Sequence, residues 1–247
     1  MKTYLSLLFV WLLVPLLLGC LSPVRLRAQE FRTPQAYSEW VMAYYEHPEP
    51  AKLYPAFAFG VTNRAIARAG GREPLVAFFG AVLRADSSLL PAFYECVAQA
   101  PAADVHYGFA SALWMANTPA SRRCLERYLR SARAQKIKGL AAEGRVLLAT
   151  PAFDIYRDLL QQPGHLDVLW ADFFATGNPD DVTRIASALA IDMDLATAAR
   201  WSLTSNGVRF PTVRRLLQAA AKENESPAVR AQLERIGNDI DKEVPKH

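Results

Sequence analysis

The stretch "HLDVLWADFFATGN" (residues 165–178) shows the pattern that decides the fold class. Its large apolar side chains recur every three or four residues and share one face: Leu166, Leu169, Trp170, Phe173 and Phe174. Such a stripe is typical of a helix that packs against its neighbours. Asp172 lies off that face, so we expect its carboxyl group to reach water. Gly177 and Asn178 predict the end of the helix.

The same helical spacing continues along most of the chain from Thr33 onward. The stretches "PASRRCLERYLRSA" (119–132) and "PTVRRLLQAAAKEN" (211–224) each carry an apolar stripe, and no run alternates with the period of two that strands show. A capping side chain precedes proline at five predicted helix starts: Thr33, Thr118, Thr150, Asn178 and Ser226. We interpret Asn206-Gly207 as a helix stop. Together these signals predict an all-α chain of about twelve helices.

The prolines after residue 90 suggest a repeat. Successive members of one set are separated alternately by 28 and 32 residues: Pro91, Pro119, Pro151, Pro179 and Pro211. Each interval holds two helical patterns, and a helical hairpin every ~30 residues is typical of an α-solenoid. Over residues 91–227 this spacing resembles tetratricopeptide and HEAT-like repeats, without the signature residues of either family. The resemblance implies a right-handed array of helical hairpins over residues 33–247, and the alternative is an irregular helical bundle.

The chain begins with an apolar segment. Residues 4–21 are apolar except for one serine and follow a lysine, which is typical of a secretory signal. The ending Leu17-Leu18-Gly19-Cys20 resembles the bacterial lipobox, although a smaller residue is usual at the place of Leu18. The resemblance implies a lipoprotein signal peptide over 1–19, lipid attachment at Cys20 and a linker over 20–32. Cleavage after Ala28 and an uncleaved single membrane anchor are the alternatives.

Composition indicates a folded domain without a nucleic-acid partner. The chain is 51% hydrophobic and 21% charged, with a formal net charge of +4, a balance typical of globular proteins. The densest basic run, over residues 122–138, is interpreted as a solvated helix face. With the lipobox resemblance, we expect the domain in the bacterial cell envelope, anchored through lipid and facing the periplasm or the exterior.

Residues that could carry chemistry are few. The sequence has no phosphate-binding loop, hydrolase elbow or metal-ligand spacing, so no catalytic residue, metal site or cofactor is predicted. The four histidines are interpreted as loop or helix-edge residues: His47, His106, His165 and His247. Cys96 and Cys124 occupy equivalent places in the repeat. We expect two buried thiols without a disulfide, because equivalent positions on stacked helices lie too far apart for one.

Large aromatic side chains give the one candidate binding surface. Trp114, Trp170 and Trp201 fall near the second helices of three successive units, and Arg200 neighbours the last. We interpret them as a groove for a peptide or other ligand, with core packing as the alternative.

The sequence therefore favours a non-catalytic scaffold or binding protein with a protein or peptide partner in the envelope. One alternative is an envelope enzyme that acts on glycans, which would need two carboxylates converging in a cleft. Acidic residues are available for such a pair: Glu95, Glu126, Glu143 and Asp172. A secreted effector or immunity partner is the other alternative.

Overall fold

The computed structural model describes residues 31–68, 70–152, 154–223 and 226–244. The apolar amino-terminal segment and Cys20 lie outside this part of the chain. The all-α prediction is confirmed, because the described residues form fourteen α-helices, more than the twelve expected, with short 3-10 turns and no strand. No single helix among them is both long and apolar enough to cross a membrane, while Arg72–Ala85 and Ser87–Ala98 meet that criterion only as a sharply bent pair.

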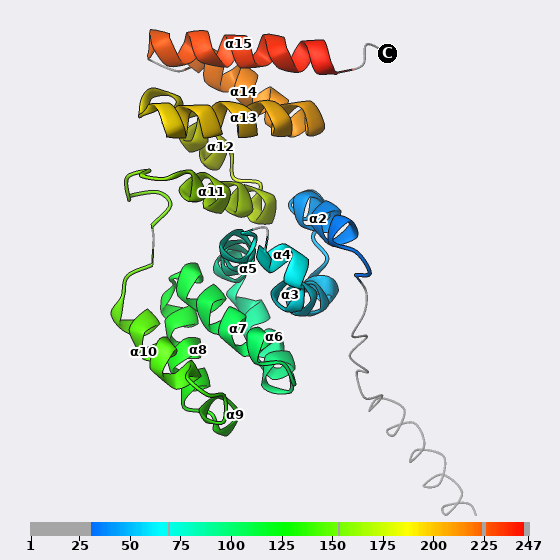
Figure 1. Ribbon diagram of the computed structural model, residues 1–247, viewed down its shortest axis with the longest axis vertical. Helices are drawn as coiled ribbons and strands as arrows, with labels where there is room; N and C mark the ends of the chain where they lie inside the picture. Colours follow the sequence, from blue (N-terminus) through cyan, green and yellow to red (C-terminus); the bar gives the residue numbers. More distant parts are fainter. Residues whose placement is uncertain (1–30, 69, 153, 224–225, 245–247) are drawn as a thin grey trace, which may run out of the picture.

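Nine helices form the part of the molecule that precedes residue 150 (Figure 1). In chain order they are α2 (Pro34–Ala43), α3 (Leu53–Thr62), α4 (Arg64–Arg68), α5 (Arg72–Ala85), α6 (Leu90–Ala98), α7 (Ala103–Ala116), α8 (Pro119–Leu129), α9 (Ala132–Gln135) and α10 (Leu140–Ala149). Two 3-10 turns accompany them, η1 (Pro50–Lys52) and η2 (Ser87–Leu89).

The remaining five helices are stacked toward the carboxyl-terminal end of the long axis (Figure 1). They are α11 (Pro163–Thr176), α12 (Pro179–Ser187), α13 (Met193–Arg209), α14 (Pro211–Glu223) and α15 (Pro227–Glu243), with η3 (Ala188–Ala190) after α12. Each of these helices contacts the next one and, where the stack continues, the next but one. This regular contact pattern gives the stack a single continuous core.

Helix α5 lies at the centre of the molecule. Its residues 75–83 are all buried, because it packs between α7 on one side and α11 on the other. Gly80 sets the approach to α7, where an added Cβ would lie 3.0 Å from the carbonyl oxygen of Ala112 and 3.0 Å from the amide nitrogen of Ala116. A side chain there would therefore meet backbone that cannot move aside.

Four of the five predicted capping starts are confirmed. Thr33, Thr118, Asn178 and Ser226 each accept a backbone N–H of the first turn that follows them. The start predicted at Thr150 is wrong, since this residue ends α10 and the next helix begins only at Pro163. No helix begins at Pro151 because side chains form hydrogen bonds with the backbone groups of the segment that follows it.

Side chains hold residues 154–158 outside a helix. The Asp154 carboxylate accepts the backbone N–H groups of Tyr156 and Arg157, and the Asp158 carboxylate accepts that of Asp154. The guanidinium group of Arg184, on α12, donates to the carbonyl oxygens of Tyr156 and Asp158. Local bonding of this kind competes with the helix, and here it fixes the segment against α12.

Two further expectations were wrong. Gly207 does not end a helix but lies within α13, where Ile240 and Leu217 pack closely over it. His106 is not at a helix edge but fully buried on α7. Its Nε2 lies 2.9 Å from the carbonyl oxygen of Ala100 and its Nδ1 bonds the Tyr128 hydroxyl. Burial lowers the pKa of His106, so the neutral ring donates to the carbonyl and accepts from the phenol.

The two described cysteines are free, as expected. Cys124 is buried, whereas Cys96 is only half-buried. The expectation of two buried thiols is thus confirmed for one of them, and the absence of a bridge between the pair is confirmed for both.

Candidate functional site

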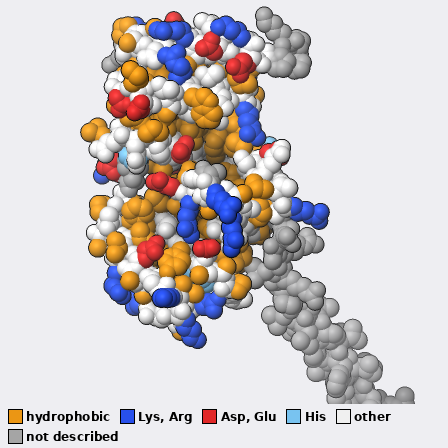
Figure 2. Space-filling view, viewed as in Figure 1, with side chains coloured by type: hydrophobic (Ala, Val, Ile, Leu, Met, Phe, Trp, Pro, Cys, Tyr) orange, Lys and Arg blue, Asp and Glu red, His pale blue; other side chains and the backbone are white. Residues whose placement is uncertain are grey.

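An apolar groove of about 440 Å³ lies between α2, α4, α5 and α11, and we call it the α2–α11 groove. Its main apolar lining residues are Tyr37, Val41, Ile66, Leu75, Phe78 and Trp170. Apolar side chains are visible on the face of the molecule where α2 approaches α11 (Figure 2). Its volume lies within the range of about 300–1,000 Å³ that is usual for ligand sites.

Helical periodicity explains how the groove is built. On α2 the lining residues are Pro34, Tyr37, Ser38 and Val41, and on α11 they are Asp167, Trp170, Ala171 and Phe174. Both sets follow the spacing i, i+3, i+4, i+7, which places four side chains along one face of a helix. Two helix faces therefore oppose each other across the groove. The central helix, α5, adds Leu75 and Phe78 to the lining.

Trp170, one of the lining residues, carries an unsatisfied hydrogen-bond donor. Its side chain is only 5% exposed, and its ring stacks on that of Phe174 with the centroids 5.8 Å apart. No acceptor for its buried indole N–H occurs among the described residues. A buried donor without a partner costs about 1–3 kcal/mol, and this nitrogen has almost no solvent-accessible surface of its own.

Asp167 is the one charged side chain among the residues that line the groove. Partial burial, followed by the negative charge of Glu73, raises the pKa of its carboxyl group. Neither Asp167 nor Glu73 forms an ion pair within the described part of the chain. One edge of the groove therefore carries negative charge without a basic partner in the described part of the chain.

The four residues that the sequence predicted to form a groove have different surroundings in the structure. Trp170 lines the α2–α11 groove, but Trp114 lies on α7 and donates to the carbonyl oxygen of Thr150 at 2.9 Å. Trp201 lies on α13 with its side chain 73% exposed. Arg200 donates to the Oε1 atom of Gln232 on α15 at 3.0 Å. No ring contact joins any two of these tryptophans in the described residues.

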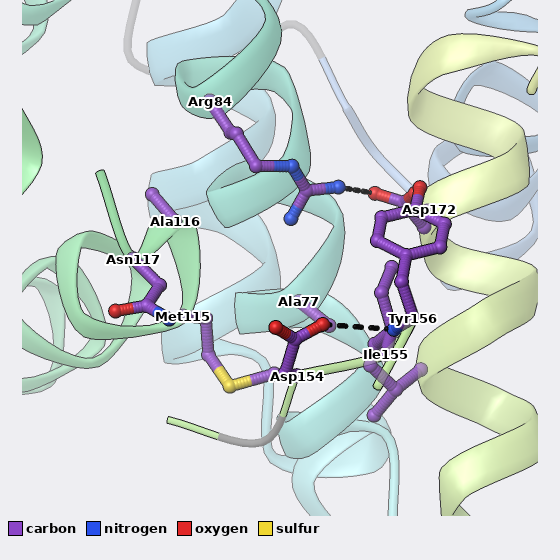
Figure 3. A pocket seen from close by; sticks show the side chains of 10 residues that line it. Ala77, Arg84, Met115, Ala116, Asn117, Asp154, Ile155, Tyr156 and Asp172 are labelled. Carbon is purple, nitrogen blue, oxygen red and sulfur yellow. Dashed lines mark hydrogen bonds and ion pairs between the residues drawn. The ribbon is translucent and has the colours of Figure 1, made fainter. Parts of the chain in front are cut away.

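A second polar centre, the carboxyl cluster, consists of Arg84, Tyr156, Asp172 and Asp181. Arg84 forms an ion pair with Asp172 (Figure 3), and the Tyr156 hydroxyl donates to Asp172 Oδ2 at 2.6 Å. Asp172 is 2% exposed, so the expectation that it reaches water is wrong. The face of α11 that carries it is covered by α5 and by the segment around Tyr156.

Asp181 occupies the first turn of α12 and is fully buried. Neither of its carboxyl oxygens lies in hydrogen-bonding geometry with a described side chain. Burial, followed by the negative charge of Asp172, raises the pKa of Asp181 to about 8. At neutral pH Asp181 therefore keeps its proton, and the pair of carboxyl groups carries one negative charge opposite the Arg84 guanidinium.

The carboxyl cluster borders a cavity of about 160 Å³, which Arg84, Asn117, Asp154, Tyr156 and Asp172 line with apolar neighbours (Figure 3). At ~30 Å³ per molecule this space holds about five waters. Asp181 is not among its lining residues. Within the described residues, no group of three or more histidine, cysteine or acidic side chains is placed to hold a metal ion.

Sequence reasoning missed Arg84, Tyr156 and Asp181. One signal for Asp181 was present, because it stands four residues before Ile185 on the buried face of an amphipathic helix. Comparison of the chain with family models, curated proteins and solved structures finds no match.

Proposed function

We propose that this chain is a non-catalytic binding protein whose α2–α11 groove receives a segment of a protein partner in the bacterial cell envelope. The observation that carries the proposal is an apolar groove of about 440 Å³ with two polar side chains, Ser38 and Asp167, among its lining residues. Binding sites combine an apolar lining with a few polar groups that fix orientation, and this groove has that composition.

The arrangement of α11–α15 supports a scaffold role. Contacts between each helix and the next two are those expected when helical hairpins stack in a row. A right-handed array similar to tetratricopeptide or HEAT-like repeats is therefore part of the proposal for this region. Such arrays present extended surfaces and are used mainly to bind other proteins.

Lipid attachment at Cys20, after removal of residues 1–19, is the proposed link to the membrane. Pro34 on α2 borders the groove and follows Cys20 by 14 residues. A fully extended chain spans at most ~3.3–3.6 Å per residue, so the groove would lie within about 50 Å of the membrane surface. Partners embedded in or attached to the same membrane would be in reach.

The glycan-cleaving alternative receives less support. Carboxyl groups of a glycosidase flank the scissile bond, so both must face the substrate. The structure does bring Asp172 beside a second carboxyl group, but Asp181 is fully buried and Asp172 is 2% exposed. An effector or immunity role also depends on a protein partner, and the identity of that partner distinguishes it from a scaffold.

Site-specific photocrosslinking in cells tests the proposal. A photoreactive phenylalanine analogue at Val41, on the groove wall, should give an adduct with a partner. The same analogue at Val146, which is 63% exposed on α10, should not. Binding to the identified, purified partner should then weaken at least tenfold in Ser38→Trp, which fills the groove from α2, and stay unchanged in Ala36→Trp on the same helix. Equal adducts from both sites, or equal binding by both variants, would exclude the groove as the binding site.

A further inference from the structure

We propose that helices α8, α9 and α10 present a basic surface that binds the headgroups of anionic phospholipids. We call it the α8–α10 basic surface, and it consists of the positively charged side chains of residues 119–149. The inference is independent of what occupies the α2–α11 groove, because the two regions share no residue. It gives the folded domain a membrane contact of its own, besides the proposed lipid attachment at Cys20.

Positive charge is concentrated in this part of the chain. Residues 119–149 contain eight basic side chains and two acidic ones, so their net charge is +6 in a chain whose total is +4. The remainder of the chain is consequently slightly negative. Helices α8, α9 and α10 contact one another and lie at the end of the long axis opposite α15 (Figure 1), where Lys and Arg side chains are visible along the lower margin of the molecule (Figure 2).

Three of the basic side chains are held by the fold. Arg122 donates to a carbonyl oxygen of α10 at 2.8 Å, and Arg133 donates to that of Ala100. The guanidinium group of Arg127 lies 5.0 Å from the centroid of the Tyr94 ring. These contacts fix the positions of the three groups, but neutral carbonyl oxygens and rings leave their charge uncompensated.

The other five basic side chains are exposed to solvent: Arg123, Arg130, Lys136, Lys138 and Arg145. None of them forms an ion pair within the described part of the chain. Arg123 and Arg130 are seven residues apart on α8 and therefore share one face of this helix. Because like charges gathered in this way repel one another, an array of anionic groups outside the molecule stabilises them, and their field attracts such a partner.

The other side chains of the region favour a lipid surface over nucleic acid. Surfaces that bind single-stranded nucleic acid combine basic residues with aromatic side chains on which bases stack, whereas Tyr128, the one aromatic residue of 119–149, is fully buried. Next to Arg145, the apolar side chain of Val146 is instead 63% exposed. Basic and apolar side chains exposed together are typical of protein surfaces that lie at a lipid interface.

The proposed lipid anchor makes a modest attraction sufficient. A chain tethered to a bilayer meets the headgroups at high effective concentration, so the second contact is an intramolecular event. Each basic side chain close to an anionic surface strengthens the attraction about fivefold. The basic surface would therefore orient the anchored domain, with α8–α10 toward the bilayer.

Fluorescence quenching in reconstituted vesicles tests the proposal. The full chain with Cys96→Ser and Val146→Cys takes a thiol-reactive fluorophore on α10, since Cys124 is buried, and the chain without Val146→Cys gives the background. The vesicles contain spin-labelled headgroups in phosphatidylcholine alone or mixed with phosphatidylglycerol. Quenching should be about twofold greater in the anionic vesicles. The difference should vanish at 1 M salt, where the Debye length is about 3 Å.

Two matched double variants separate the surface from the net charge of the chain. Arg123→Gln with Lys136→Gln should remove most of the extra quenching in anionic vesicles. Lys222→Gln with Arg235→Gln removes the same charge from exposed positions on α14 and α15 and should preserve it. An unchanged Tm in both double variants establishes that each is folded.

Quenching that is equal in the two kinds of vesicle, or that both double variants lower equally, would overturn the proposal. If quenching is equal and labelled duplex DNA binds the wild type more tightly than Arg123→Gln with Lys136→Gln, the surface belongs to a nucleic-acid partner and the lipid assignment is wrong. Neither result bears on crosslinking at Val41, so the proposed function is decided separately.

Discussion

Replacement of Asp181 by asparagine should stabilise the folded chain at neutral pH. Asparagine has nearly the shape of aspartic acid, and it remains neutral at every pH of interest. In the wild-type protein the fully buried Asp181 must retain its proton on folding, while the same group in the unfolded chain has released it to water. The variant avoids this difference in proton binding.

The size of this stabilisation follows from the shift in the pKa of Asp181. The pKa of Asp181 rises from the ordinary aspartate value of 3.8 to about 8 in the folded state, so below pH 3.8 both states hold the proton. Between these values only the folded state binds it, and stability falls as pH rises, by about 1.4 kcal/mol for each pH unit. The loss reaches about 4 kcal/mol at pH 7 and is complete above pH 8. The free energy of unfolding of Asp181→Asn should therefore exceed that of the wild type by up to about 4 kcal/mol at pH 7. At pH 3 the protonation of Asp181 should cause no difference between the two.

Urea unfolding followed by far-ultraviolet circular dichroism at pH 3 to 9 measures the effect. The free energy of unfolding of the wild type should decline between pH 4 and 8 relative to that of Asp181→Asn. Asp180→Asn, which changes the adjacent exposed residue, should follow the wild-type profile. Parallel profiles for the wild type and Asp181→Asn would refute the conclusion that Asp181 is protonated in the folded protein.

Three other substitutions test separate features. Arg84→Met leaves its buried partner Asp172 without a cation and should destabilise the chain by about 3 kcal/mol at pH 7, measured by urea unfolding, with less effect at pH 3. Gly80→Ala places a Cβ 3.0 Å from the backbone of α7 and should cost about 1–3 kcal/mol, seen as a lower Tm; an unchanged Tm would contradict the close approach. Cys20→Ala should abolish labelling by a fatty-acid analogue and release the chain from the membrane fraction, and equal labelling would exclude the lipid anchor.

Local signals predicted the boundaries that depend on local bonds. The αL turn at Gly177 (φ 72°) ends α11, and the Asn178 side chain opens α12, as the sequence indicated. The stretch that begins at Pro151 resembled a helix start in the same way, yet Tyr156 and Asp158 are held by Arg184, which lies 28 and 26 residues beyond the carbonyl oxygens it binds. The helical periodicity of a sequence contains no information about such a partner.

In the candidate sites, too, local signals were predictable from the sequence, whereas contacts with residues distant in the chain were not. Trp170 was recognisable as a large aromatic residue on an apolar stripe, but its role in the groove depends on α2, which precedes it by more than 120 residues. Asp172 was expected in water because periodicity assigns one buried face to a helix, whereas α11 is covered on two faces. Its partner Arg84 is 88 residues away in the sequence, and only the tertiary arrangement brings them together.

The burial of α5 on all sides has a consequence for the order of events during synthesis. About 80 residues separate the end of α5 from the start of α11, which covers one of its faces. At roughly 5–20 residues per second, the synthesis of α11 would follow that of α5 by about 4–16 s. During translation, the face of α5 that packs against α11 therefore has no partner until α11 has been synthesised.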